Sequence, residues 1–446
     1  MADVWVFLLA GASLVLLGFA AAQVFDRFRI PDYFILMALG LLLGSGFLPL
    51  GGLDPRASLA SVAPLLTSIA LAFILFEGGL VLHVRGMGGV WAVAALHTAI
   101  AMALSMAGMW LVATQLLGLT SMTALILALA FCGPSATIVL GFLPRSGVEA
   151  RTRFTLTVEG VVGNIVATIL VILLVRLPAD PAASLAWAPF LMNVGATVIV
   201  AFVAGEGWAR AVRGPRPRSF AFMTSVALAV FLYAIGEGLL GGNGGLAAFV
   251  FGLVLGHRRV LLAPQPGAQG SRGLQEFHRE LVFLLRTFFF LYLGLRVSLS
   301  GITENLLFAA IAFGMVFYIS RLPSSIGLVR VWRLPPLDAG ILRATVGRGM
   351  TDTVLILFAI EVGVIPPAEA SFVTNLLFLV IVVAAALSAG LVMMAERTAR
   401  SIASRRPALP PALPKAEGPS NQVPEQLDRA MAQFLDDPLV KRGQID

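Results

Sequence analysis

Long apolar runs separated by short polar gaps extend from residue 4 to residue 395 of the chain. A helix needs about 20 apolar residues to cross a bilayer, so these runs predict about 13 membrane-spanning helices. The runs are continuous and do not alternate between apolar and polar positions, which excludes an outer-membrane β-barrel. The predicted spans cover residues 4–24, 31–50, 61–82, 88–115, 121–143, 154–177, 186–206, 219–237, 242–260, 277–296, 303–321, 337–361 and 369–395.

The composition supports this pattern. Of the 446 residues, 58% are hydrophobic and 12% are charged, whereas a soluble domain has about 45–50% apolar and about 25% charged residues. A water-soluble globule could not bury this apolar excess, so the sequence predicts an all-α polytopic membrane protein. The lone Cys132 cannot form an internal disulfide, and a disulfide scaffold is therefore excluded.

The basic residues indicate an orientation in the membrane. The net charge is +7, and 29 of the 31 basic residues are arginine. The gaps after odd-numbered spans hold 17 arginines, whereas the gaps after even-numbered spans hold 3, namely Arg56, Arg176 and Arg296. We expect the protein in the inner (plasma) membrane of the cell. Cytoplasmic loops are enriched in Lys and Arg, so we expect the N-terminus outside and the C-terminus in the cytoplasm. Basic residues placed in the gaps are topology signals and do not indicate a nucleic-acid partner.

The composition changes after the last span. Residues 1–395 are expected to form the transmembrane domain, and residues 396–446 a cytoplasmic tail. The tail contains a Pro/Ala-rich stretch at 407–414 and lacks the apolar content of a packed core, so most of it is expected to be disordered. Residues 424–440 have the pattern of a short amphipathic helix.

Charged and strongly polar side chains inside the predicted spans are candidates for function, because burying a charge there costs at least about 2.5–3.5 kcal/mol. His97 and Arg286 are weaker members of this set. The stronger members are Glu77, Glu159, Asn164, Arg343, Arg348 and Asp352.

Two spans contain helix-breaking residues in their middle. The first break is Phe131–Thr137, which includes Gly133 and Pro134, and the second is Val346–Asp352, which includes a Gly-Arg-Gly sequence. Irregular backbone within a bilayer is tolerated only where it is buried in protein or lines a cavity. Interrupted helices at corresponding places in two halves of a chain indicate the ion site of a secondary transporter. The two breaks are seven spans apart, as inverted repeats of spans 1–6 and 8–13 would place them.

These features also have structural interpretations. A glycine-proline pair in a membrane helix is often a packing kink. Glu159 needs a partner, and Arg348 is the obvious one; such a pair acts either as a structural tie or as part of the transport site. Glu77 is expected to be structural, near a helix kink, and His97 to be a packed or interfacial side chain.

Several segments form an ordered set of motifs along residues 1–395. In order and spacing, they resemble the monovalent cation/proton antiporter superfamily, the sodium or potassium/proton exchangers. The segments are Ile30–Tyr33 with Leu39–Gly44, Leu75–Leu80, Gly133–Thr137, Glu159–Asn164, Gly244–Gly256, Phe288–Leu295, Ser320–Pro323 and Gly347–Gly349.

The resemblance implies an antiporter-like fold with inverted repeats and two broken crossing helices. It also implies a homodimer in which a core bundle, spans 4–6 and 11–13, moves in an elevator-like manner against a scaffold. Family members carry an essential aspartate in an Asn-Asp or Asp-Asp pair of the ion-site helix, and often another in a Thr-Asp-Pro segment. In this chain the aligned positions hold Gly163-Asn164 and Cys132-Gly133-Pro134.

The missing aspartates determine which residue is expected to bind the proton. Antiport needs a group that holds either a proton or a cation, and a buried carboxylate has this property. Asn164 can coordinate a cation but cannot titrate, so Asp352 is the first candidate and Glu159 the second. The predicted ion/proton site is completed by Arg348, Ser135, Thr137 and Thr351.

The resulting expectation is a secondary active transporter that exchanges a monovalent cation, Na⁺ or K⁺, for protons. The alternative is a non-canonical or non-transporting member of the same fold, with an altered ion or coupling or a sensor-like role, because Gly133 and Asn164 replace the usual aspartates. The spans contain no Gly-x-Ser-x-Gly or His-Glu-x-x-His sequence, so neither an enzyme nor a cofactor is expected, and no metal other than the transported cation.

Overall fold

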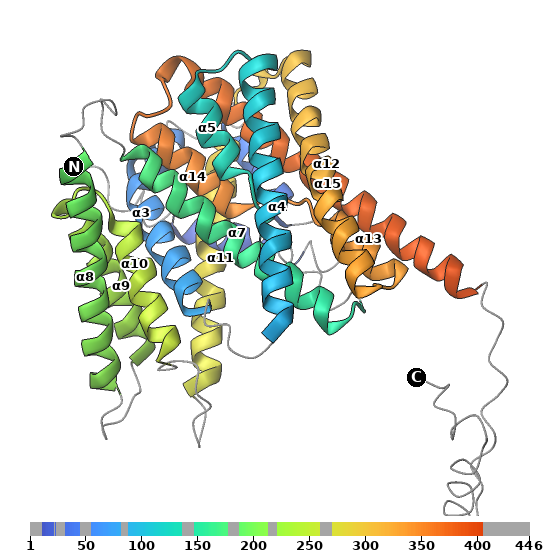
Figure 1. The fold of residues 1–446 in the computed structure, drawn as a ribbon. Helices are drawn as coiled ribbons and strands as arrows, with labels where there is room; N and C mark the ends of the chain where they lie inside the picture. Colours follow the sequence, from blue (N-terminus) through green and yellow to red (C-terminus); the bar gives the residue numbers. More distant parts are fainter. Residues whose placement is uncertain are drawn as a thin grey trace, which may run out of the picture. The chain divides into compact units, whose positions relative to one another are not determined.

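A computed structural model describes residues 11–21, 23, 32–44, 55–81, 88–135, 147–176, 187–212, 221–258 and 270–404 (Figure 1). The chain divides into two compact units, residues 1–399 and 400–446, and the arrangement below is that of the first unit. After the helical residues 11–21, the helices are α2 (Asp32–Gly44), α3 (Pro55–Val81), α4 (Gly88–Leu111, followed by the π-helical turn η1, Val112–Leu116), α5 (Ser121–Ala130), α7 (Ala150–Val175), α8 (Trp187–Val212), α9 (Ala221–Gly238), α10 (Gly244–His257), α11 (Gly270–Arg296), the 3₁₀ turn η4 (Leu299–Gly301), α12 (Glu304–Trp332), α13 (Pro336–Ala344), α14 (Met350–Glu361) and α15 (Pro367–Ser404).

The described residues confirm the all-α membrane architecture. Six of their helices are long and apolar enough to cross a membrane, and five shorter apolar helices lie within other predicted spans. The number of thirteen spans stays a prediction. The six long segments are Leu59–Leu80, Val90–Leu116, Ala150–Val175, Trp187–Val212, Glu304–Trp332 and Pro367–Ile402.

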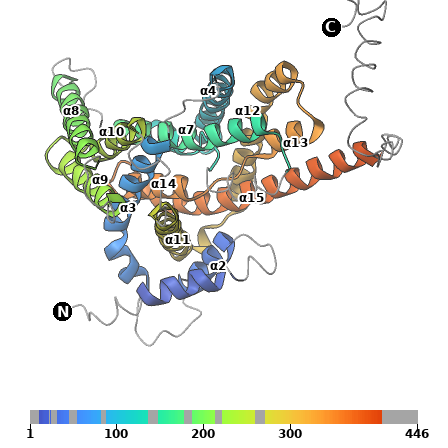
Figure 2. The ribbon, with the colours of Figure 1, turned by 90° about the horizontal axis from the view of Figure 1, so that it is seen from below.

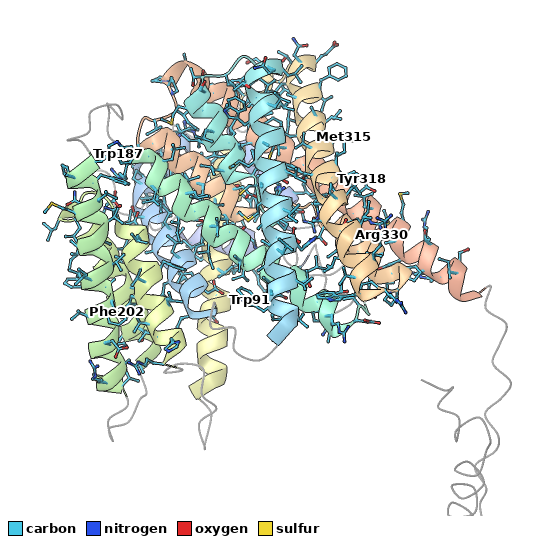
Figure 3. The ribbon with its side chains drawn as sticks, viewed as in Figure 1. Trp91, Trp187, Phe202, Met315, Tyr318 and Arg330 are labelled. Atoms are coloured by element: carbon cyan, nitrogen blue, oxygen red, sulfur yellow. The ribbon has the colours of Figure 1, made fainter. Side chains whose placement is uncertain are left out.

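The outward faces of the peripheral helices are apolar, as lipid contact requires. Phe202 on α8 and Met315 on α12 are 51% and 48% exposed, and their side chains point away from the neighbouring helices (Figure 3). Trp91 and Trp187 lie in the first turns of α4 and α8, where aromatic rings favour the interface between lipid and water.

The helices of the first unit form two groups. In the scaffold group, α3 packs against α9, α10 and α11, α10 packs against α8 and α9, and α11 packs against α2. In the bundle group, α4 packs against α5, α7 and α12, α14 packs against α5 and α7, and α13 packs against α7 and α12. The side chains of α15 join this group through α5, α12 and α13. Figure 2 shows α8, α9 and α10 at one edge, with α4, α12 and α13 away from them.

Helices α7 and α14 of the bundle group contact helices of the scaffold group. From the bundle group, α7 contacts α3 and α10, and α14 contacts α3 and α11. Ile165 and Ile172, seven residues apart on one face of α7, lie against Gly78 of α3 and Gly245 of α10; a Cβ at either glycine would be 2.5 or 2.4 Å from the isoleucine. The boundary along α7 is therefore apolar and shaped by small residues.

Glycines allow the scaffold helices to pack backbone against backbone. A Cβ added to Gly252 of α10 would lie 2.1 Å from the carbonyl oxygen of Phe76 in α3, and one added to Gly40 of α2 would lie 2.2 Å from that of Leu291 in α11. Small residues at membrane helix interfaces permit this close approach. The Gly244–Gly256 motif is thus explained by packing.

The substitution Gly252→Ala should destabilise the protein, because the new methyl group meets backbone that cannot rotate away. Overpacking typically costs about 1–3 kcal/mol, so we expect a lower midpoint of thermal unfolding in detergent, followed by tryptophan fluorescence. Gly207→Ala on α8 is the matched control, since its Cβ would meet nothing within 4 Å. Equal midpoints for the two variants would contradict the packing argument.

Two helices extend beyond their predicted ends. The predicted span 303–321 is wrong at its C-terminal end, because α12 continues through Pro323 to Trp332. Neighbouring helices can stabilise a proline-containing membrane helix, and here Arg321, expected in a polar gap, is 3% exposed inside the protein. The helix α15 likewise continues past 395 to Ser404. The tail helix predicted at 424–440 lies outside the described residues.

Candidate ion site

The two predicted breaks meet in the structure. The helix α5 ends at Ala130 and is followed by irregular backbone through Ser135, and a second irregular segment separates α13 from α14 at residues 345–349. The amide of Ser135 donates a hydrogen bond of 3.0 Å to the carbonyl oxygen of Gly347. Irregular segments of the two halves therefore satisfy each other's backbone groups, as the predicted crossing requires.

The first break also lies directly against α7. A Cβ at Gly133 would be 3.2 Å from the backbone of Gly163, the residue that precedes Asn164. Asn164 itself is 9% exposed and Ser135 is 1% exposed. The aligned positions that carry aspartates in the resembled family are thus neighbours in space here, occupied by a glycine and an amide.

Arg348 is held by the first break and by an aromatic ring. Its Nη1 donates to the carbonyl oxygen of Gly133, and its guanidinium carbon lies 3.9 Å from the centroid of the Phe317 ring of α12. Phe131 packs against Phe317 as well. An arginine over an aromatic face gains a cation–π interaction, so these contacts fix Arg348 at the crossing.

The predicted pair between Glu159 and Arg348 is wrong. Glu159 of α7 forms a bidentate ion pair with Arg321 of α12, with Nη1–Oε1 and Nη2–Oε2 distances of 2.5 and 2.8 Å. Arg321 also donates to the carbonyl oxygen of Leu342 at 2.8 Å, and Nε2 of His97 lies 3.5 Å from Oε2 of Glu159. The extension of α12 beyond its predicted end is the reason, because it carries Arg321 into the protein.

Asp352 lies at the N-terminus of α14, beside the crossing. It is 1% exposed, and its Oδ2 accepts a hydrogen bond of 2.6 Å from the amide of Gly349. Arg348 and the thiol of Cys132 are its electrostatic neighbours. The first turn of a helix favours a negative charge, so the Gly349 amide and Arg348 favour the ionised carboxylate, whereas burial of the side chain opposes it.

The other predicted residues are distributed as follows. Thr351 is the second residue of α14 and is 6% exposed. Glu77 is half-buried in α3, in the scaffold group, and α3 is helical through it to Val81. Thr137 lies outside the described residues. The contacts above bring Ser135, Arg348 and Asp352 to one crossing and place Glu159 in a separate ion pair.

Sequence reasoning missed Arg321 and the position of His97 beside Glu159. Arg321 is the last residue of the predicted span 303–321 and one of the 17 arginines assigned to the gaps after odd-numbered spans. A signal was present, because Ile326, Leu328, Val329, Val331 and Trp332 are apolar and could have indicated that the helix continues to Trp332. His97 is buried, as expected of a packed side chain, and its neighbour is a carboxylate.

Comparisons with known proteins match this architecture. A family model described as "Sodium/hydrogen exchanger, transmembrane" matches residues 11–395. The chain is 28% identical over 381 residues to the K(+)/H(+) antiporter NhaP of Alkalimonas amylolytica, covering 83% of this chain and 62% of the relative. It is 24% identical over 406 residues to the K(+)/H(+) antiporter NhaP2 of Shewanella sp. (strain MR-4), covering 88% and 67%. The chain thus spans less than two thirds of the first relative's length.

The fold is similar to that of a solved structure. The sodium proton antiporter MjNhaP1 from Methanocaldococcus jannaschii at pH 8 has a TM-score of 0.69 and 16% sequence identity, and the match covers 89% of this chain and 98% of that one. At this identity the likeness concerns the fold, and it confirms the predicted antiporter-like arrangement.

Proposed function

Because the chain belongs to the sodium/hydrogen exchanger family, we propose that it exchanges a monovalent cation, Na⁺ or K⁺, for protons as a secondary active transporter. The names of two relatives and of the structural neighbour, which are K⁺/H⁺ and sodium/proton antiporters, support this class of activity. The proposal includes a homodimer in the plasma membrane, with the N-terminus outside. It also includes a transmembrane domain over residues 1–395 and a cytoplasmic tail over residues 396–446.

The observation that carries the proposal is the position of Asp352. It is a buried carboxylate beside two crossing breaks, held by the Gly349 amide. A carboxylate in such a place binds either a proton or a cation, and each excludes the other. Glu159 is engaged with Arg321, which leaves Asp352 as the better candidate of the two.

Neutral oxygen atoms complete the proposed site. Asn164, Ser135 and Thr351 supply amide, hydroxyl and backbone oxygens of the kind that hard cations prefer, and we assign Thr137 to the same set. Arg348 acts as a positioning residue that keeps the first break against α14 through Gly133. Glu77 is assigned a structural role in the scaffold group.

Transport is proposed to occur by an elevator-like movement of the bundle group. The site residues belong to α7, α14 and the breaks, and these elements pack within the bundle group. Where α7 meets the scaffold group, the boundary is apolar, with Gly78 and Gly245 against Ile165 and Ile172. Sliding along such a surface exposes Asp352 to each side in turn without breaking the Glu159–Arg321 pair.

A second candidate is a non-canonical or non-transporting member of the same fold, with an altered ion or coupling or a sensor-like role. Gly133 and Asn164 at the aspartate positions favour it. Arg348 favours it too, because a permanent positive charge at the Gly133 carbonyl opposes the approach of a cation.

Reconstituted liposomes distinguish the two candidates. A Na⁺ or K⁺ gradient is imposed on proteoliposomes that contain a pH-sensitive dye, with choline as the control cation and protein-free liposomes as the blank. Proton movement driven by Na⁺ or K⁺ but not by choline is the expected result. Proton movement at the level of the blank with both cations would reject exchange and favour the second candidate.

A further inference from the structure

A polar contact crosses the boundary between the two groups where α7 ends. Arg176, the residue after α7, forms an ion pair through Nη2 with Oε1 of Glu237 at the end of α9. Its Nε donates a hydrogen bond of 3.1 Å to the carbonyl oxygen of Gly242, which lies in the turn between α9 and α10. A Cβ at Gly242, whose φ is +82°, would lie 2.4 Å from this Nε. The guanidinium of Arg176 therefore packs directly against the turn at Gly242, where a side chain would clash with it.

Further contacts cross the boundary where α11 ends. The amide of Ser298 donates to Oδ1 of Asn375 at 3.0 Å, and Nδ2 of Asn375 donates to the carbonyl oxygen of Ser298 at 3.2 Å. Ser298 follows α11 of the scaffold group, and Asn375 lies in α15 of the bundle group. Glu361, the last residue of α14, is an electrostatic neighbour of Arg296, the last residue of α11. Arg176 and Arg296 are two of the three arginines in gaps expected on the outside.

We propose that Arg176, Glu237 and Gly242 form an outer latch, which holds the bundle group to the scaffold group at the outer end and opens when the bundle moves. This inference rests on the proposed elevator-like movement. It explains why Arg176 and Arg296 occur in gaps that are otherwise poor in arginine, because Arg176 contacts Glu237 and Arg296 lies near Glu361 across the boundary.

The exposure of the latch suits a contact that opens in every cycle. The side chains of Arg176 and Glu237 are 25% and 33% exposed, and ion pairs in contact with water are weak. The Glu159–Arg321 pair, at 1% and 4% exposure, lies wholly within the bundle group, and breaking it would leave a buried charge. The weak pair is thus at the moving boundary and the strong pair inside the moving body.

Hydrogen exchange measured by mass spectrometry tests the latch without requiring transport. In Arg176→Ala and in Glu237→Gln, we expect amide exchange to increase at Ser298 as well as in the turn at residues 239–243. The Ser298 amide reports movement of the whole bundle, because its acceptor is Asn375 of α15 and not part of the latch. We expect the rate of amide exchange to increase about two- to five-fold, because losing a partly exposed ion pair changes the equilibrium for opening by about this factor.

The matched control is Arg258→Ala. Arg258 binds Glu206 through two hydrogen bonds of 2.8 and 2.9 Å, and this ion pair joins α8 to the end of α10 within the scaffold group. Exchange at Ser298 should be unchanged in this variant. An increase confined to residues 239–243 in the latch variants, or an equal increase at Ser298 in Arg258→Ala, would overturn the proposal.

A cross-link provides a second test that uses transport. The variant Arg176→Cys with Glu237→Cys is treated with a cleavable bifunctional thiol reagent; the native Cys132 is buried, and the wild type is treated in parallel. We expect the cross-link to stop cation/proton exchange and cleavage of the cross-link to restore it. Cation/proton exchange at the full rate in cross-linked protein would refute the latch. If no sample, wild type included, shows cation/proton exchange, the proposed function is refuted, and the amide hydrogen exchange measurement decides on the latch.

Discussion

Asp352→Asn abolishes cation-driven proton movement while the protein still folds: this is the expected result if Asp352 holds the proton and competes for the cation. Asparagine keeps the size of the side chain and an oxygen that can accept the hydrogen bond from the Gly349 amide, but it cannot titrate. The first turn of α14 loses a stabilising negative charge, worth about 0.3–1 kcal/mol. Arg348 loses a charged neighbour but keeps its contacts with the Gly133 carbonyl oxygen and the Phe317 ring, so we expect the variant to fold. Exchange in proteoliposomes should therefore fall to the level of protein-free liposomes.

Two further variants make the result specific. Asp352→Glu retains a titratable group and should keep part of the activity with a shifted pH profile. Asp338→Asn is the matched control, because Asp338 is also buried and accepts a hydrogen bond of 2.9 Å from the Glu149 amide, but lies in α13, before the break. Normal exchange with an unchanged pH profile in Asp352→Asn would transfer the proton-binding role to Glu159.

Arg321→Ala is expected to destabilise the protein more than the double substitution Glu159→Ala with Arg321→Ala. The single change leaves the Glu159 carboxylate buried without its cation, which costs about 3–5 kcal/mol, whereas the double change leaves no unpaired charge. Thermal unfolding midpoints of the wild type, both single variants and the double variant in detergent form a double-mutant cycle that isolates the coupling.

A parallel cycle with Arg348 checks the assignment of partners. Arg348 contacts Gly133 and Phe317, so Glu159→Ala and Arg348→Ala should be closer to additive than the first cycle. A stronger coupling of Glu159 to Arg348 than to Arg321 would show that the ion pair described above is not the one formed in the membrane.

The breaks could be predicted because their cause is local. Proline lacks a backbone donor and glycine favours irregular backbone, so Gly133-Pro134 and the glycines around Arg348 mark interruptions whatever surrounds them. Ser135 and Gly347 then bond to each other, as two corresponding interrupted helices would.

The partner of Glu159 could not be predicted because it depends on packing. Arg321 is followed closely by Pro323, and locally this sequence is typical of a helix end. Contacts with α4 and α13, together with the hydrogen bond of 2.6 Å between Ser105 and Ser320, accompany the continued α12. In the continued helix, Arg321 faces α7 and forms the ion pair with the Glu159 carboxylate that the sequence had assigned to Arg348.

The buried arginines of the bundle group set the charge that this group carries in each crossing of the proposed cycle. Arg321 is paired with Glu159, and Arg348 stands beside Asp352, so these four groups carry no net charge when both carboxylates are ionised. A cation at Asp352 and a proton at Asp352 each raise the charge by one. The membrane potential, worth about 2.3 kcal/mol per charge at 100 mV, then acts equally on the cation-loaded and proton-loaded crossings, which run in opposite directions. Under the proposal that one cation and one proton alternate at Asp352, the work of the potential cancels over one cycle, and exchange would follow the concentration gradients of the two ions regardless of voltage.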